Sequence, residues 1–316
     1  MATVNGVASN YLDLLTKLRD FLVANGWVQI GGTASGAITS DSEFVSLKAL
    51  GLTGDDEILM TLQTTSVPAS NAYALRLRGH TAYVNPGVNQ PGSDSPWVYL
   101  LTLNSPIEYW IVANGRRFIL IAKVSSRYDA MYGGFILPEH LPSDWSYPLF
   151  VGASCAVGNV PQASDAMYHS NFWNTYSFGT PANNDTPTSA YLFSPIQAWV
   201  PVRNGYSSTS LGVEVNTGRI TVPWNTASLQ NVRRQIDDAP WVRQGQLAAV
   251  SKTPSGTIDI NVPEGGAFYG SFDGVYYTPS FGATAEQETV IGGTTFKMFP
   301  NISRTSVGQF AAIKMD

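Results

Sequence analysis

The clearest hydrophobic pattern in the chain is a pair of nearly continuous apolar runs in its first half. Residues 107–113 (IEYWIVA) and 116–125 (RRFILIAKVS) are rich in β-branched and aromatic residues, and only Asn114 and Gly115 separate them. Asn-Gly tolerates the positive φ angles that a type I′ turn needs at both central residues, so the pattern predicts a tight β-hairpin. Because the arms hardly alternate between apolar and polar positions, we expect the hairpin to be covered on both faces, with its turn end exposed.

One amphipathic helix is predicted near the N-terminus. Asn10 can cap the first turn, and Asp13 favours the positive end of the helix dipole. Asn25-Gly26 ends the helix, since glycine suits a left-handed cap. We expect the helix to pack on the protein's own sheet, the alternative being a helix that docks onto a neighbouring subunit. Its apolar face is formed at helical spacing by Leu14, Leu15, Leu18, Phe21 and Leu22.

The rest of the chain consists mainly of short β runs separated by Gly and Pro turns. Residues 43–50 and 57–64 predict a second hairpin, and residues 71–84 alternate, with Leu77 inward and Arg76 and Arg78 outward. The class is therefore mainly β (α+β), with the helix followed by antiparallel sheets in a sandwich- or barrel-like arrangement. Weak helical character occurs at 227–236, and the other predicted strands are 27–30, 150–156, 191–202, 212–222, 247–253, 256–262, 266–277, 294–299 and 310–315.

Two regions are predicted, with one continuous domain as the alternative. Residues 1–150 carry the helix and the central hairpin, and residues 151–316 form a second β-rich region with a long loop at 164–187. That loop is polar and aromatic with little periodicity, which is typical of a functional loop or an interface segment. Within it, Phe172, Trp173 and Tyr176 are the best candidates for an exposed binding or assembly surface, although a loop packed on its own domain is the favoured interpretation.

Low charge is the main compositional feature. Charged residues make up 13% of the chain, about half the usual share, which suits either a protein covered by partners or an ordinary β-rich extracellular protein. The net charge is −5, and no basic run exceeds Arg116-Arg117 and Arg233-Arg234, so nucleic acid is not expected as a partner. Residues 1–8 show no secretory signal and no apolar run approaches the roughly 18 residues of a membrane span, so we expect a soluble protein made in a cytoplasm.

No catalytic constellation is visible in the sequence. His80, His140 and His169 are far apart and lack metal-ligand spacing, and no nucleophile elbow or phosphate-binding loop occurs. The carboxylates at 55–57 and 237–238 are adjacent on turns and do not define the two facing acids that a glycosidase needs. We therefore expect no enzyme activity, no cofactor and no metal site.

The single cysteine limits which cross-links and metal sites the chain can form. With Cys155 alone, the chain can form neither an intramolecular disulfide framework nor a CxxC metal site. We expect its side chain to be a small buried hydrophobe.

Three stretches together are similar to a known family. The N-terminal ASNYLDLLTKLRDFLVANGW, the central SPIEYWIVANGRRFILIAKVSSRYDAMYGGFILP followed by YPLFVGAS, and the C-terminal IGGTTFKMFPNISRTSVGQFAAIKMD resemble tailed-bacteriophage virion proteins described as structural proteins or tail components. The central block is distinctive as a string, and residues 164–236 match nothing in that family. The resemblance supplies no catalytic residues.

The resemblance implies a structural component of the phage particle, most simply in the tail, baseplate or neck. Such a protein is made in the host bacterial cytoplasm and resides in the virion, where its partners are other virion proteins and copies of itself in a symmetric assembly. Arg116 and Arg117, at the expected exposed end of the hairpin, could then meet an acidic neighbour. The alternative is a carbohydrate- or receptor-binding module at a tail tip or fibre, with a host-surface glycan as partner.

Overall fold

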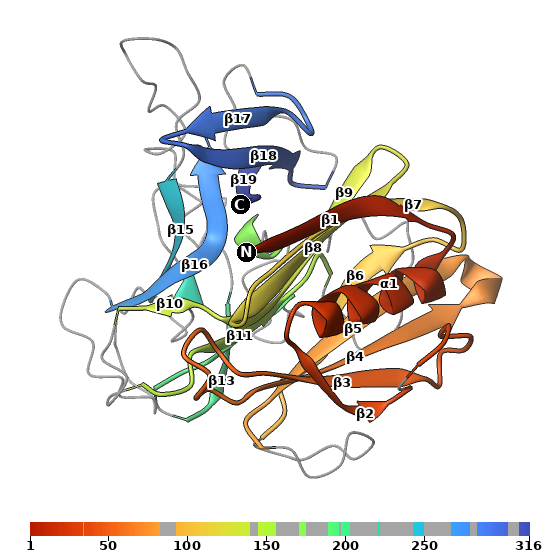
Figure 1. The fold of residues 1–316 in the computed structure, drawn as a ribbon, viewed down its shortest axis with the longest axis horizontal. Helices are drawn as coiled ribbons and strands as arrows, with labels where there is room; N and C mark the ends of the chain where they lie inside the picture. Colours follow the sequence, from red (N-terminus) through yellow and green to blue (C-terminus); the bar gives the residue numbers. More distant parts are fainter. Residues whose placement is uncertain are drawn as a thin grey trace, which may run out of the picture.

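The described part of the chain folds into three antiparallel β-sheets and one α-helix, shown in Figure 1 for the computed structural model. The fold class predicted from the sequence, mainly β with a helix near the N-terminus, is confirmed. The predicted elements at 227–236 and 256–262, and most of those at 164–187 and 212–222, lie outside the described residues. The structure describes residues 1–33, 35–82, 93–139, 145–155, 171–174, 189–195, 197–202, 220–221, 243–249, 267–278, 283–302 and 310–316.

The first seven-stranded sheet, here called the central sheet, joins segments from both halves of the chain. It runs across position 150, where the sequence places a domain boundary, and the division into two domains stays a prediction. In spatial order its strands are β1 (Ala2–Ala8), β7 (Ile107–Ala113), β8 (Arg117–Val124), β9 (Arg127–Phe135), β11 (Leu149–Gly152), β12 (Ala190–Phe193) and β13 (Trp199–Pro201).

Two further sheets flank the central sheet. The five-stranded N-terminal sheet has the order β2 (Val28–Gly32), β3 (Phe44–Ala49), β4 (Ile58–Val67), β5 (Ala72–His80) and β6 (Val98–Thr102), with a short 3₁₀ turn, η1 (Pro68–Ser70), between β4 and β5. The C-terminal sheet has the order β14 (Ile220–Thr221), β15 (Arg243–Ala249), β16 (Ala267–Thr278), β19 (Phe310–Lys314), β18 (Thr294–Pro300) and β17 (Glu288–Ile291), and β10 (Leu137–Pro138) pairs with β16. A second 3₁₀ turn is η3 (Phe172–Asn174).

The first strand, β1, has no counterpart among the predicted elements. It pairs with β7 over its whole length, from Ala2 opposite Ala113 to Ala8 opposite Ile107. Its sequence, ATVNGVA, has weak intrinsic β propensity because of its Ala, Asn and Gly residues. The segment therefore forms a strand because it pairs with a tertiary partner, the apolar edge strand of the hairpin.

The helix α1 (Tyr11–Ala24) has the predicted ends. The side chain of Asn10 accepts hydrogen bonds from the amides of Leu12 and Asp13, each at 3.0 Å. Asp13 in turn accepts from the amide of Ser9, the residue before the cap, at 2.8 Å. At the other end, Gly26 takes the left-handed conformation with φ +90°. The helix therefore starts and stops for the reasons visible in the sequence.

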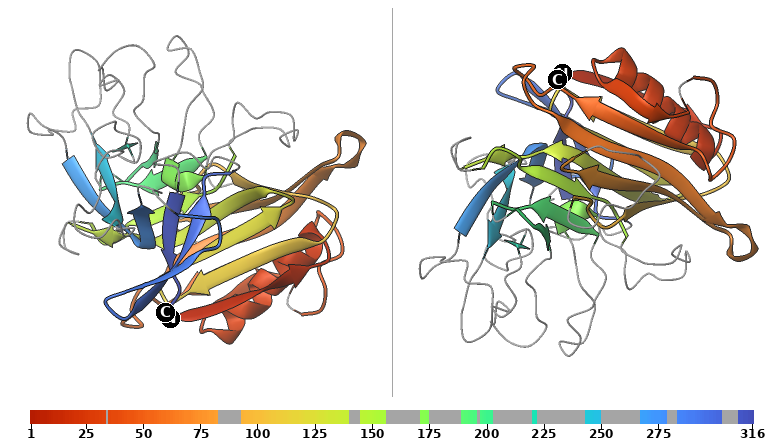
Figure 2. Two further views of the ribbon diagram at one scale, coloured as in Figure 1. Left: turned by 90° about the horizontal axis from the view of Figure 1, so that it is seen from above. Right: turned by 90° about the horizontal axis from the view of Figure 1, so that it is seen from below.

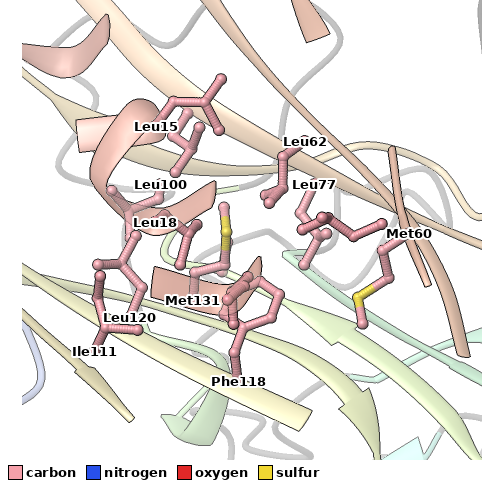
Figure 3. Packing of buried hydrophobic residues seen from close by; sticks show 14 of the residues in the cluster. Leu15, Leu18, Met60, Leu62, Leu77, Leu100, Ile111, Phe118, Leu120 and Met131 are labelled. Atoms are coloured by element: carbon pink, nitrogen blue, oxygen red, sulfur yellow. The ribbon is translucent and has the colours of Figure 1, made fainter. Parts of the chain in front are cut away.

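The central sheet is covered on both faces, as the apolar arms of the hairpin predict. Alternate residues of β8, such as Leu120, lie in a core with α1 and the N-terminal sheet, where Leu18 and Leu77 also lie (Figure 3). The intervening residues, such as Ile119, lie in a second core with Phe299 of the C-terminal sheet. The views in Figure 2 show α1 and the C-terminal sheet on different sides of the hairpin strands. The predicted packing of the helix on the protein's own sheets is thus confirmed.

The hairpin turn itself differs from the prediction. Neither Asn114 nor Gly115 has a positive φ angle, so the turn is not type I′. Instead the side-chain oxygen of Asn114 accepts the amides of Arg116 at 2.8 Å and Arg117 at 3.0 Å, while the Asn114 amide donates to the Arg117 carbonyl at 3.0 Å. An asparagine side chain can replace a backbone acceptor in this way, which removes the need for a left-handed residue.

Candidate functional site

The hairpin tip meets all three sheets. Its Arg117 side chain is fully buried and donates to the carbonyl of Val112 at 3.3 Å and to the sulfur of Met1 at 3.0 Å. Its Nε lies 3.3 Å from Oδ2 of Asp273, which belongs to β16 of the C-terminal sheet. The guanidinium also lies flush against Gly274, since a Cβ built there would be 2.2 Å from Nη2.

The turn residues are held from two further sides. Asn114 donates from Nδ2 to Asp273 at 2.8 Å, and its carbonyl accepts the indole N–H of Trp27 at 2.9 Å. Gly115 lies against the loop that follows β3, where a Cβ would be 2.3 Å from the carbonyl oxygen of Gly51. The prediction of an exposed tip is therefore wrong for Arg117. Arg116 is half-buried.

Phe172 and Trp173 do not form the candidate exposed surface, and the favoured interpretation, packing on the protein's own domain, is confirmed for these two residues. Both side chains are fully buried in the core between the central and C-terminal sheets. The ring of Phe172 lies 5.4 Å from that of Phe272 and 5.6 Å from that of Tyr132, within a set of tilted and edge-on aromatic contacts. Polar neighbours in the sequence suggested a surface loop, whereas these rings fill the core. Tyr176 lies outside the described residues.

The outer face of the N-terminal sheet carries a polar network that sequence reasoning missed. Thr61 of β4 and His80 of β5 are joined at 2.8 Å between Oγ1 and Nε2, and Nδ1 of His80 lies 2.7 Å from Oδ1 of Asp94. Ser46 of β3 continues the line at 2.9 Å from the Thr61 hydroxyl. Arg78 pairs with the second oxygen of Asp94 at 3.1 Å. Only the position of His80, two residues after Arg78 on the same strand face, was visible in the sequence.

This order of hydroxyl, imidazole and carboxylate is the order of a nucleophilic triad, but its chemistry is blocked. Thr61 is 2% exposed, Ser46 is fully buried, and the Thr61 hydroxyl already has the Ser46 hydroxyl as a partner. Burial lowers the pKa of His80, although Asp94 acts in the opposite direction. The lowered pKa favours the neutral ring. The network therefore fastens β3, β4 and β5 to the segment at Asp94.

A cavity of about 900 Å³ opens beside this network, at the N-terminal end of β4. Tyr147 spans it: its hydroxyl accepts from the amide of Leu59 at 3.2 Å and lies 2.8 Å from the carbonyl of Glu57. Burial raises the pKa of Tyr147. The acidic turn predicted at Asp55-Asp56 forms one wall. The lining residues are Ile30, Lys48, Asp55, Asp56, Glu57, Leu59, Thr81, Ala82, Phe135, Ser146 and Tyr147.

The described part of the chain has neither a cluster of metal-ligating side chains nor a membrane-spanning helix. No group of three or more His, Cys, Asp or Glu side chains there could hold a metal ion. None of the helices described is both long and apolar enough to cross a membrane. Cys155 is buried, as expected of a small apolar side chain, and His140 and His169 lie outside the described residues.

No family model matches the chain, and a search of the curated proteins gives no match.

Proposed function

We propose that this protein is a structural component of a bacteriophage particle, in the tail, baseplate or neck, and that it acts by protein–protein assembly. The observation that carries the proposal is the meeting in space of the three stretches that resemble phage virion proteins. They lie far apart in the sequence, and they contain α1, the strands β7 to β9, and the strands β18 and β19.

These stretches build one framework. Leu18 of α1 and Leu120 of β8 share the core on one face of the central sheet. On the other face, the ring of Phe299 in β18 lies 5.2 Å from that of Trp110 in β7. A resemblance confined to segments that contact one another is what a shared scaffold produces, because core positions constrain one another's size and shape.

A buried framework leaves assembly to the sheet edges and loops. At the edge of the central sheet, β1 presents Val7 with 60% of its surface exposed. At the edge of the C-terminal sheet, β17 presents Val290 at 67%. Edge strands offer unpaired backbone groups to another chain, and exposed apolar side chains favour such a contact.

The experiment compares incorporation into particles for two edge variants and one control. Val7→Glu and Val290→Glu are expected to keep the melting temperature of the isolated protein while at least one of them loses incorporation, measured by mass spectrometry of purified particles. Lys17→Glu, on the exposed side of α1, should be incorporated normally. A stable monomer that is absent from particles even as the unmodified chain would overturn the proposal.

A second function, binding of a host-surface carbohydrate, is favoured by the cavity beside Tyr147. Carboxylates such as Asp55 and Asp56 are suitable acceptors for sugar hydroxyls, and the cavity is large enough for a sugar ring. Trp173 is fully buried, so it cannot stack on a sugar ring at the surface. A glycan array gives the test: binding that is lost in Asp56→Asn supports this function, and the absence of any bound glycan contradicts it.

A further inference from the structure

The outer face of the N-terminal sheet gathers two arginines around one tryptophan. The guanidinium carbon of Arg76 lies 4.3 Å from the ring centroid of Trp97, and that of Arg78 lies 4.4 Å from the same ring. Both arginines are on β5, two residues apart, so they share one face of the strand, as the sequence pattern predicts. Trp97 stands immediately before β6, the neighbouring strand in Figure 1.

The two arginines have different partners. Arg78 is neutralised by Asp94, at 3.1 Å between Nη1 and Oδ2. Arg76 makes no ion pair within the described part of the chain, and its Nη2 donates to the neutral Oε1 of Gln63 at 2.7 Å. This group of side chains therefore carries one positive charge that no carboxylate among the described residues offsets.

We propose that Arg76, Arg78 and Trp97 form a binding site for an oxyanion, a carboxylate or a phosphate group carried by a ligand. A guanidinium offers five N–H donors in a planar fork that matches the oxygens of both groups. One donor of Arg76 is used by Gln63, and its Nε is buried out of reach of a ligand, so the remaining Nη hydrogens are the donors that the site offers. The proposal is independent of the assembly function and of the cavity beside Tyr147.

The site is held in place before any ligand arrives. Gln63 is oriented by its own amide, which donates to the carbonyl of Asp41 at 2.8 Å. Its oxygen therefore faces Arg76, and the indole of Trp97 supports the guanidinium face. An arginine fixed in this way loses little rotamer entropy on binding, which is the advantage of a preorganised site.

The second arginine adds electrostatic repulsion to the site when no anion is bound. Burial lowers the pKa of Arg78, Asp94 opposes that effect, and the nearby charge of Arg76 adds to it. Two cations beside one indole and one carboxylate repel each other, and an anion at Arg76 relieves that repulsion. Because Asp94 offsets the charge of Arg78, the group of side chains has a net charge of +1. That charge favours a single oxyanion over a polyanion.

The test is a titration followed by the indole N–H signal of Trp97 in nitrogen-15 NMR spectra, assigned with Trp97→Phe. The probes are glucose 6-phosphate and glucuronate, with glucose as the neutral control. We expect saturable shifts with at least one charged probe at millimolar concentration and none with glucose. A response to the phosphate alone or to the carboxylate alone shows which of the two groups the site binds.

Variants distinguish a site from a purely structural stack. Arg76→Gln should weaken binding at least about tenfold, the effect of losing a hydrogen bond to a charged group. Arg76→Lys should weaken it less, because it keeps the charge and loses the fork. Lys17→Gln removes a distant cation and should leave the affinity unchanged. No saturable shift with either charged probe, or equal affinity in Arg76→Gln and Lys17→Gln, would overturn the proposal.

Discussion

Arg117 and Asp273 form an ion pair at the point where the three sheets meet, with 3.3 Å between Nε and Oδ2. The arginine comes from the central hairpin and the aspartate from β16, 156 positions later in the chain. The guanidinium is fully buried, and the carboxylate side chain is 20% exposed. The pair thus joins the hairpin tip to the C-terminal sheet.

Breaking this pair should destabilise the fold. Arg117→Met leaves Asp273 without its cationic partner, although Asn114 still donates to it, and we expect the free energy of unfolding to fall by about 3 kcal/mol, as for other broken buried pairs. Urea denaturation measures the loss. The double variant with Asp273→Asn should lose less than the sum of the single variants, because the two side chains interact directly. A loss no larger than that of Lys17→Met would contradict the assignment.

The same burial changes the meaning of a charge reversal at the tip. From the sequence, Arg117→Glu tests an interface with an acidic neighbour. In the structure it places a carboxylate against Asp273 in a buried site, so the expected result is an unfolded monomer. Circular dichroism of the isolated protein decides between the two: a native spectrum in Arg117→Glu is incompatible with the buried position.

Gly274 should tolerate no side chain. It has φ +77°, and a Cβ there would be 2.2 Å from Nη2 of Arg117. Gly26 is a matched control, because it has φ +90° with nothing within 4 Å of a built Cβ. Both alanine variants lose about 1 kcal/mol from the left-handed backbone, and Gly274→Ala should lose a further ~1–3 kcal/mol from overpacking. Equal melting temperatures for the two variants would show that Arg117 moves aside without cost.

Phe172 should behave as a core residue. Its side chain is fully buried against Tyr132 and Phe272, so Phe172→Ala should cost about 3–5 kcal/mol of stability. Val290→Ala, at a side chain 67% exposed, should change stability by less than about 0.5 kcal/mol. Thermal unfolding of both variants provides the measurement. If Phe172→Ala kept full stability but lost a binding activity, the original surface hypothesis would be restored.

Glu43 should contribute stability that depends on pH. Its carboxylate accepts the amide of Thr39 at 2.8 Å, the amide of Ser40 at 3.0 Å and the hydroxyl of Thr33 at 2.7 Å. These bonds, with the Thr39 amide first, lower its pKa from 4.5 to about 2. A carboxyl group whose pKa falls on folding stabilises above its unfolded pKa and loses that contribution as the pH falls through the folded value.

The matching experiment follows the stability of the natural chain and of Glu43→Gln from pH 6 down to pH 2, an interval chosen to span both values of about 4.5 and about 2. The natural chain should be more stable at the upper end, and the difference should shrink below the unfolded pKa. A difference that stays constant over the whole interval would show that the carboxylate charge plays no part in holding the loop.

The sequence by itself determined the elements whose signals are local. Asn10 and Gly26 end the helix because capping depends on residues within one turn. The apolar arms 107–113 and 116–125 required cover on both faces. Alternation along one strand placed Arg76 and Arg78 on one face and Leu77 on the other. The mainly β class follows from such local patterns, and it is what the structure has.

Only the tertiary structure decided what depends on distant partners. The strand β1 exists because β7 offers it an edge, and Phe172 is buried because Tyr132 and Phe272 surround it. Arg117 looked like an exposed cation, since no local pattern could indicate that Asp273 would reach it. The contact between His80 and Asp94 could not be predicted from the sequence for the same reason. Contacts between positions far apart in the chain are set by how the sheets stack, and that stacking leaves no local trace in the sequence.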